Sequence, residues 1–324
     1  MLTYILRRLL YSIPVLIAAS FLTFTFVVLT ADPLQNLKGS VRADQTQIER
    51  ISHRYHLDEP VVVQYGYWFK QAATHKLGNT LVGNTPIWPD LQRVLGHTLQ
   101  LLLLAEIFAL VFGVALGVYS AIRQYSLFDY TTTTLSFVGL AMPIFWLALM
   151  LQVLVTNAYL KWDIRIFYTA GLSSNDAGTG IAFVIDRLQH LALPAFCIAV
   201  VNLATYSRFM RASMLEVVNS DYVRTARAKG LKERRVVMRH AFRNALIPII
   251  TLVGLNFGAL FGGAIVTETI FSLDGMGAYF IRALADGDPY RIQAWLMVSA
   301  TMIIIGNLFA DILYGYLDPR IRYD

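Results

Sequence analysis

Long runs of apolar residues without a charge are the feature that most constrains this chain. There are four of them: Leu9–Ala31, Tyr130–Leu160, Asn244–Thr267 and Ile292–Ala310. Each can cross a hydrocarbon core about 30 Å thick, which takes roughly 20 helical residues. Two further runs, Val94–Ile122 and Leu188–Ser207, also fit, although Glu106 interrupts the first. We therefore expect an all-α membrane protein with six transmembrane helices.

The bulk composition agrees with a membrane protein. Apolar residues make up 56% of the 324 positions and charged residues 15%, whereas about a quarter of the residues of a soluble domain are charged. The first apolar run follows Arg7 and Arg8, but it exceeds the roughly 7–15 apolar residues of a signal peptide. We interpret it as a retained signal anchor. The single cysteine, Cys197, lies within a span, so neither an intrachain disulfide nor a cysteine-based metal site is expected.

The charges of the loops predict an orientation. With the N-terminus inside, the inner loops carry fifteen basic and six acidic residues, and the outer loops twelve and thirteen. The positive-inside rule therefore places both termini and residues 207–246 in the cytoplasm. Since the basic charge is explained as an orientation signal, it is no indication of nucleic-acid binding.

These boundaries divide the chain into four parts. Residues 1–30 are the N-terminal cytoplasmic end and the first transmembrane helix, and residues 31–97 are an extracytoplasmic loop or cap. Residues 98–315 form a five-helix core that includes the cytoplasmic segment 207–246, and residues 316–324 are a cytoplasmic tail.

The outer loops are expected to have structure of their own. Three residues recur at helical spacing within residues 44–56: Ile48, Ile51 and Tyr55. This helix either covers the outer mouth or belongs to a packed cap without ligand contact. His53 and His56 could share a helix face, but without a third ligand a solvated face is favoured over a metal site. In the last outer loop, Gly275 and Gly277 predict a tight turn.

Small and polar residues mark several spans. Three glycines spaced four apart share one face of the fifth span: Gly254, Gly258 and Gly262. This face favours tight helix packing, with a flexing or pathway-lining face as the alternative. Asn202 and Asn256 lie at membrane depth and need partners or water. For Glu106 we favour a buried, hydrogen-bonded structural group over a proton relay, because no chain of acids and histidines accompanies it.

Several kinds of chemistry have no motif in this chain. It contains no G-x-x-x-x-G-K-[ST], no H-E-x-x-H and no G-x-S-x-G. We therefore predict no catalytic residues, no metal site and no nucleotide-phosphate loop.

The basic segment contains a short helix with its own boundary signals. Asn219 or Ser220 can cap its start, and Asp221 lies in the first turn, where the helix dipole favours a negative charge. Lys229 lies in the last turn, and Gly230 is a natural left-handed terminator. A second helix, from residue 232 to about 244, then leads to Ile247 and Pro248 at the start of the fifth span.

The two faces of this short helix differ in character. Tyr222, Val223 and Ala226 gather on one side, and Arg224 and Arg227 project from another. An ordinary positively charged loop does not explain apolar side chains and two helix boundaries outside the membrane.

The segment DYVRTARAKGL, followed by RHAFRNALIP, resembles a known family. It is similar to the permease subunit of bacterial peptide ABC importers of the oligopeptide/dipeptide type, the "B" member of the permease pair, within the binding-protein-dependent inner-membrane component family. The family's EAA-x-x-x-G loop aligns with residues 224–230, although its glutamate is replaced here. LRRLLYSIPVLI, LGNT, ETIFSLDGMG and LDPRIR extend the resemblance over the whole chain.

The resemblance implies a type I ABC importer permease fold in the bacterial inner membrane. It implies a coupling helix whose apolar face fills a groove of an ATPase subunit, formed by Asp221, Tyr222, Val223, Arg224, Thr225, Ala226, Arg227, Ala228, Lys229 and Gly230. The implied partners are a homologous second permease, two ATPase subunits that bind ATP and Mg, and an outer binding protein that delivers peptide. This chain would hold no cofactor.

Several alternatives stay open from the sequence. Family relatives carry glutathione, nickel complexes or haem in place of peptides. An ion-coupled secondary transporter would show inverted repeats and broken helices with charges at the midplane. A membrane scaffold would need no ATPase.

Overall fold

The computed structural model describes residues 2–30, 34, 38, 45–74, 77–81, 83–260 and 264–317. Within these ranges the regular elements are helices, apart from one isolated antiparallel bridge between Asn79 and Pro86. Six helices in the described part are long and apolar enough to cross a membrane. The expected all-α, six-span fold is therefore confirmed.

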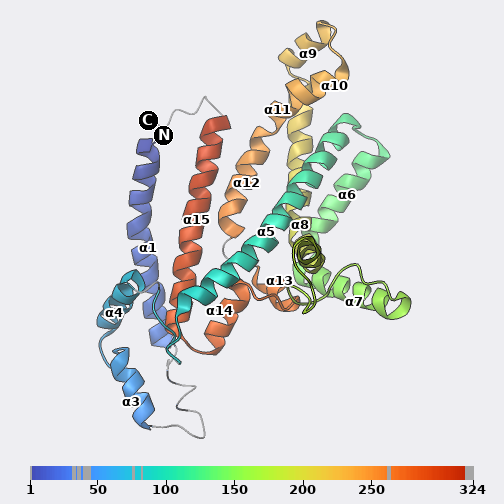
Figure 1. Ribbon diagram of the computed structural model, residues 1–324. Helices are drawn as coiled ribbons and strands as arrows, with labels where there is room; N and C mark the ends of the chain where they lie inside the picture. Colours follow the sequence, from blue (N-terminus) through green and yellow to red (C-terminus); the bar gives the residue numbers. More distant parts are fainter. Residues whose placement is uncertain are drawn as a thin grey trace.

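The chain alternates between the two ends of the molecule (Figure 1). In chain order the helices are α1 (Leu2–Thr30), α3 (Gln45–Arg54), α4 (Val61–Thr74), α5 (Ile87–Ile122), α6 (Leu127–Ala141), α7 (Ile144–Trp162), α8 (Ile181–Val218), α9 (Asp221–Ala228), α10 (Glu233–Arg235), the π-helix η1 (Val236–Ala241), α11 (Phe242–Ala245), α12 (Ile247–Leu260), α13 (Ile265–Ile270), α14 (Met276–Ala285) and α15 (Pro289–Leu317).

Two groups of helices make up the fold. In one group α5 packs along α8, with α6 beside them, and in the other α1 and α12 pack on α15. The start of α1, the end of α15 and α9 lie towards the upper end in Figure 1, whereas α3, α4 and α14 lie towards the lower end. An ion pair between Arg8 and Asp311 joins α1 to α15. The first and last helices thus begin and end at the same end of the molecule, as expected for a chain that crosses the membrane an even number of times.

The third span differs from the prediction. The run Tyr130–Leu160 was expected to form one helix, but it is divided between α6 and α7. Met142 is extended, with φ −78° and ψ 123°, and α7 turns away from the axis of α6 (Figure 1). The cause is Pro143, which has no N–H to donate to α6 and disfavours helical backbone at the residue before it.

Two glycines of α5 let it touch the backbone of α8. A Cβ on Gly117 would lie 2.5 Å from the carbonyl oxygen of Ser207 and 2.7 Å from Cβ of Met210. A Cβ on Gly113 would lie 2.9 Å from Cβ of Tyr206. The four-residue spacing of these glycines is typical of close helix packing in membranes, and sequence analysis had not singled it out.

The segment after α1 is folded against the chain's own helices. The predicted helix at residues 44–56 is confirmed as α3. The Tyr65 hydroxyl lies 2.6 Å from the Ser20 hydroxyl, so that α4 is bound to α1, and Trp68 is buried. The Tyr55 and Tyr290 rings, 5.0 Å apart, join the end of α3 to the start of α15. These contacts favour the packed-cap alternative.

Candidate functional site

The basic segment after α8 forms the upper end of the molecule (Figure 1). The predicted short helix is α9, Asp221–Ala228, with Asp221 in its first turn. Gly230 has φ +73°, the left-handed conformation expected of a helix terminator. The boundaries predicted from the sequence are thus confirmed.

The predicted side-chain cap of α9 is wrong. Ser220 occupies the N-cap position, but its hydroxyl donates to the carbonyl of Val217 at 2.6 Å. The Asn219 amide likewise donates to the carbonyl of Leu215 at 2.9 Å. Both side chains therefore close the last turn of α8, and neither accepts a hydrogen bond from the first amides of α9.

The apolar face of α9 is covered by the chain itself. Val223 is 0% exposed and Ala226 is 6% exposed, and both belong to a core cluster that also contains Val236 and Val237 of η1. An eight-residue helix is too short to be stable alone, so it needs this packing. The expectation that this face fills a partner's groove is therefore wrong for Val223 and Ala226, because the chain's own fold buries them. Tyr222, the third residue predicted on this face, stays exposed, and its hydroxyl accepts a hydrogen bond from the Asn244 amide at 2.9 Å.

The opposite face of α9 is polar and exposed. Its exposed residues are Asp221, Arg224, Thr225, Arg227 and Ala228, and Lys229 and Gly230 are exposed directly after the helix ends. Arg227 bonds within the chain: its Nη2 lies 2.8 Å from Oε1 of Glu233, and its Nη1 donates to the Val218 carbonyl at 3.3 Å. The hydrogen bond to Glu233 raises the pKa of Arg227. Arg227 therefore fastens α9 to its neighbours, and Arg224 is the outward-facing arginine.

The second predicted helix is present with an irregular middle. Residues 233–245 form α10, η1 and α11, and α12 begins at Ile247. Pro248 is the second residue of α12, in the first turn, where its missing N–H breaks no intrahelical bond. A π-helical turn thus lies between α9 and α12. The fifth stretch that is long and apolar enough to cross a membrane is Glu233–Gly254, which begins before the predicted Asn244–Thr267.

The three polar residues predicted to need partners lie together. The Asn202 amide donates to the Glu106 carboxylate at 3.1 Å, and the Asn256 amide donates to the Tyr206 hydroxyl at 2.9 Å. That hydroxyl in turn donates to Glu106. One network therefore joins α5, α8 and α12, and Glu106 is 6% exposed. This geometry agrees with the structural role that we favoured for Glu106.

The glycine face of the fifth span is described only in part. Gly254 is buried in α12, which packs mainly on α15 and also on α8. Gly258 lies in the same helix, and Gly262 lies outside the described residues. The packing and pathway alternatives for this face therefore both stay predictions.

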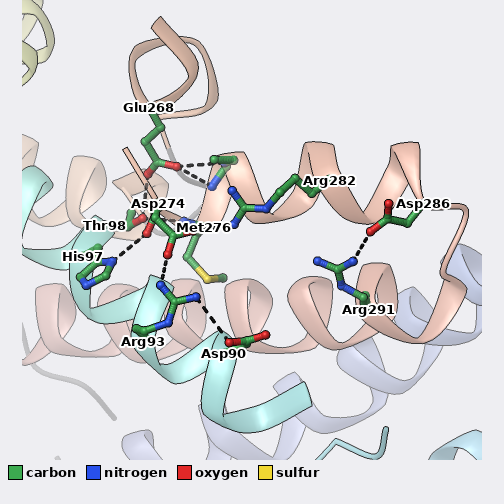
Figure 2. Close-up of polar contacts among 12 residues, drawn as sticks. Asp90, Arg93, His97, Thr98, Glu268, Asp274, Met276, Arg282, Asp286 and Arg291 are labelled. Atoms are coloured by element: carbon green, nitrogen blue, oxygen red, sulfur yellow. Dashed lines mark hydrogen bonds and ion pairs between the residues drawn. The ribbon is translucent and has the colours of Figure 1, made fainter. Parts of the chain in front are cut away.

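A polar cluster at the lower end centres on Glu268 of α13 (Figure 2). This carboxylate is 0% exposed and accepts from the amides of Gly277 at 2.7 Å and Ala278 at 3.1 Å. It also accepts from the Thr98 hydroxyl at 2.7 Å, which itself accepts from the Met276 amide at 2.7 Å. Glu268 and Thr98 thus cap the start of α14, where the helix dipole favours a negative charge.

Asp274 extends this cluster to the surface. Its carboxylate pairs with Arg282 of α14 at 2.6 Å and with Arg93 of α5. Nδ1 of His97 also lies 2.7 Å from its carbonyl oxygen. Figure 2 shows these side chains converging between α5 and α14. Together with Glu268, Asp274 fastens the α13–α14 connection to α5.

Gly275 and Gly277 have a different role from the predicted turn. Gly275 has φ −113°, a conformation open to any residue. However, a Cβ on Gly275 would lie 2.4 Å from the Glu268 carboxyl carbon, and one on Gly277 would lie 2.6 Å from Cα of Ile265. Glycine is required here for close approach to α13.

No metal site is found in the described ranges of the chain, where no group of three or more His, Cys, Asp or Glu residues could hold an ion. His53 lies 3.5 Å from Asp58, and the His56 ring stacks on Tyr67 with centroids 3.6 Å apart.

Two family models match this sequence. Residues 113–323 match the binding-protein-dependent transport system inner membrane component, and residues 1–87 match the N-terminal part of such membrane components. The chain belongs to this family. It is therefore a multi-pass inner-membrane permease, and the resemblance seen in its sequence is confirmed.

Named relatives match this permease over its whole length. It is 42% identical to the dipeptide transport system permease protein DppB of Alkalihalophilus pseudofirmus, over 100% of both chains. It is 39% identical to the oligopeptide transport system permease protein AppB of Bacillus subtilis, also over 100% of both. It is 37% identical to DppB of Escherichia coli, over 100% of this chain and 99% of the other.

Three residues of the buried polar networks in this permease were not predicted from the sequence: Tyr206, Thr98 and Glu268. Tyr206 lies one helical turn after Asn202, so this spacing could have assigned it to the same buried network. Thr98 and Glu268 carry no comparable signal, because they are 170 residues apart and meet only through packing.

Proposed function

We propose that this permease is the membrane subunit of an ATP-driven importer of peptides, with α9 as its coupling helix. ATP and Mg would be bound by two partner ATPase subunits on the cytoplasmic side, and a soluble outer protein would deliver the peptide. The peptide would pass between this chain and a homologous second permease. The full-length relatives named for dipeptide and oligopeptide transport support peptide as the substrate class.

The observation that carries the proposal is the attachment of α9. This helix stands at one end of the molecule, exposes a polar face and is fixed on its other face to η1. It directly follows the 38-residue helix α8, and η1 leads on to α12. A displacement of α9 would therefore move both α8, which precedes it, and α12, which follows it through η1. Binding energy that favours one position of α9 would shift the population between inward- and outward-open states.

Reconstitution in liposomes tests this function. The permease is combined with its candidate second permease, ATPase subunits and binding protein, and peptide uptake is measured alongside ATP hydrolysis. We expect peptide-loaded binding protein to stimulate both. Uptake driven by an ion gradient without ATPase subunits would instead identify a secondary transporter, and complete inactivity of all components together would point to a scaffold.

The Gly230→Val variant tests the role of the helix terminator. No atom lies within 4 Å of a Cβ at this position, so the cost comes only from φ +73°. Left-handed backbone costs a residue with a Cβ about 1–2 kcal/mol, and a β-branched one more. We expect normal membrane insertion but roughly tenfold lower ATP-driven uptake, since about 1.4 kcal/mol is a factor of ten. Gly230→Asn, which tolerates this conformation, is the control, and equal uptake by both variants would contradict the prediction.

The Arg224→Glu variant tests the outward face of α9. An exposed ion pair contributes about 0.2–1 kcal/mol, and reversal adds repulsion, so ATPase-subunit binding is expected to weaken by roughly threefold to tenfold. Co-purification with the ATPase subunits measures this change. Arg50→Glu, an exposed arginine of α3 at the other end, is the matched control. Undiminished co-purification of the Arg224 variant would argue against ATPase docking on this face.

A further inference from the structure

A buried carboxylate joins three helices near α9. Asp129, in the first turn of α6, is 2% exposed. Nε and Nη2 of Arg211 on α8 donate to its two oxygens at 2.6 and 2.7 Å, and the Tyr125 amide donates at 3.0 Å. The Ser120 hydroxyl of α5 also donates to Asp129. We name these four residues the Asp129 joint.

The joint lies close to the start of the proposed coupling helix. Arg211 is ten residues before Asp221, which corresponds to about 15 Å along a helix. One turn from the joint, Gly117 brings the backbone of α5 against α8 at Ser207. The backbone approach joins α5 to α8 and the bidentate ion pair joins α6 to α8, so two different contacts hold α8 at nearly the same level.

Capping of the α5–α6 turn does not account for the whole joint. The Tyr125 amide and the Ser120 hydroxyl satisfy that turn from nearby in the chain. Arg211 comes from a different helix, 82 residues away in sequence. A bidentate guanidinium–carboxylate pair fixes orientation as well as distance. The Arg211 contact thus opposes sliding or rotation of α8 against α6.

We propose that Asp129 and Arg211 are positioning residues that make α5, α6 and α8 move as one unit when α9 is displaced. This rests on the proposed function of α9. Since α9 is attached to α8, its displacement reaches α5 and α6 through their lateral contacts with α8. Without the ion pair, α8 slips against them and ATP hydrolysis becomes uncoupled from peptide movement.

The test compares Asp129→Asn and Arg211→Lys in the complete reconstituted transporter. Asparagine keeps the shape but loses the charge, and lysine keeps the charge but loses the two-pronged geometry. The amount of assembled complex, ATP hydrolysis stimulated by loaded binding protein and peptide uptake are all measured. We expect hydrolysis to persist while uptake per ATP falls about tenfold, equivalent to about 1.4 kcal/mol of coupling free energy.

Asp286→Asn is the control, because it breaks an ion pair with Arg291 at the opposite end of the molecule. It is expected to leave uptake per ATP unchanged. An unchanged ratio in both Asp129 and Arg211 variants, or failure of both to assemble, would overturn the positioning role. An inactive unsubstituted transporter would instead count against the proposed function, so the two failures are distinguishable.

Discussion

Gly117→Ala is expected to separate α5 from α8 and to cost the permease most of its folded yield. The new Cβ would lie 2.5 Å from the Ser207 carbonyl oxygen and 2.7 Å from Cβ of Met210. These atoms are fixed to the α8 backbone, so a rotamer change cannot relieve the overlap. Overpacking of this kind costs about 1–3 kcal/mol. The amount of monodisperse protein in detergent and its thermal midpoint measure the loss.

Gly96 provides a matched control on the same helix. A Cβ at Gly96 meets no atom within 4 Å. Alanine is also favoured over glycine in a helix interior by about 0.8–1.0 kcal/mol. Gly96→Ala should therefore be neutral or stabilising, although the chemical change is identical. Equal thermal midpoints for the two variants would mean that the close approach of α5 to α8 is not needed.

Gly275→Ala is expected to displace the Glu268 carboxylate and to loosen the α13–α14 connection. The new methyl group would lie 2.4 Å from the carboxyl carbon of Glu268. Because that side chain is fully buried and holds three hydrogen bonds, movement leaves a charge without its partners. A hydrogen bond to a charged group contributes about 1.5–3 kcal/mol. A lower thermal midpoint and lower peptide uptake are both expected.

Glu268→Gln tests the hydrogen bonds of the Glu268 carboxylate without the steric overlap that a methyl group at position 275 introduces. An amide has one donor side, which would face either the Thr98 hydroxyl or the amides of α14. We expect destabilisation by about 2 kcal/mol, the middle of the range for hydrogen bonds to charged groups. Glu49→Gln on exposed α3 is the control and should have little effect. A Glu268→Gln variant as stable as this control would refute the capping role of Glu268.

Features that depend on a few neighbouring residues could be predicted from the sequence, whereas contacts between segments distant in sequence could not. Gly230 was identified as a helix terminator because a left-handed residue ends a helix through its own backbone. Pro143 is a local signal of the same kind, since a proline ends the helix before it. It was not used because the long apolar run around it was interpreted as one span. By contrast, the buried face of α9 was assigned to a partner because its real neighbour, η1, follows ten residues later and folds back on it.

The sequence by itself determined the membrane class, the number of spans and the boundaries of α9, because apolar length and backbone preference are local properties. Only the tertiary structure decided which polar groups meet. Asn202 and Glu106 are 96 residues apart, Arg211 and Asp129 are 82, and Thr98 and Glu268 are 170. A side chain buried among spans must find a partner wherever the helices pack. That need predicts that a partner exists. The contacts of α8 with α5 and α6, and of α5 with α13, decide which residue the partner is.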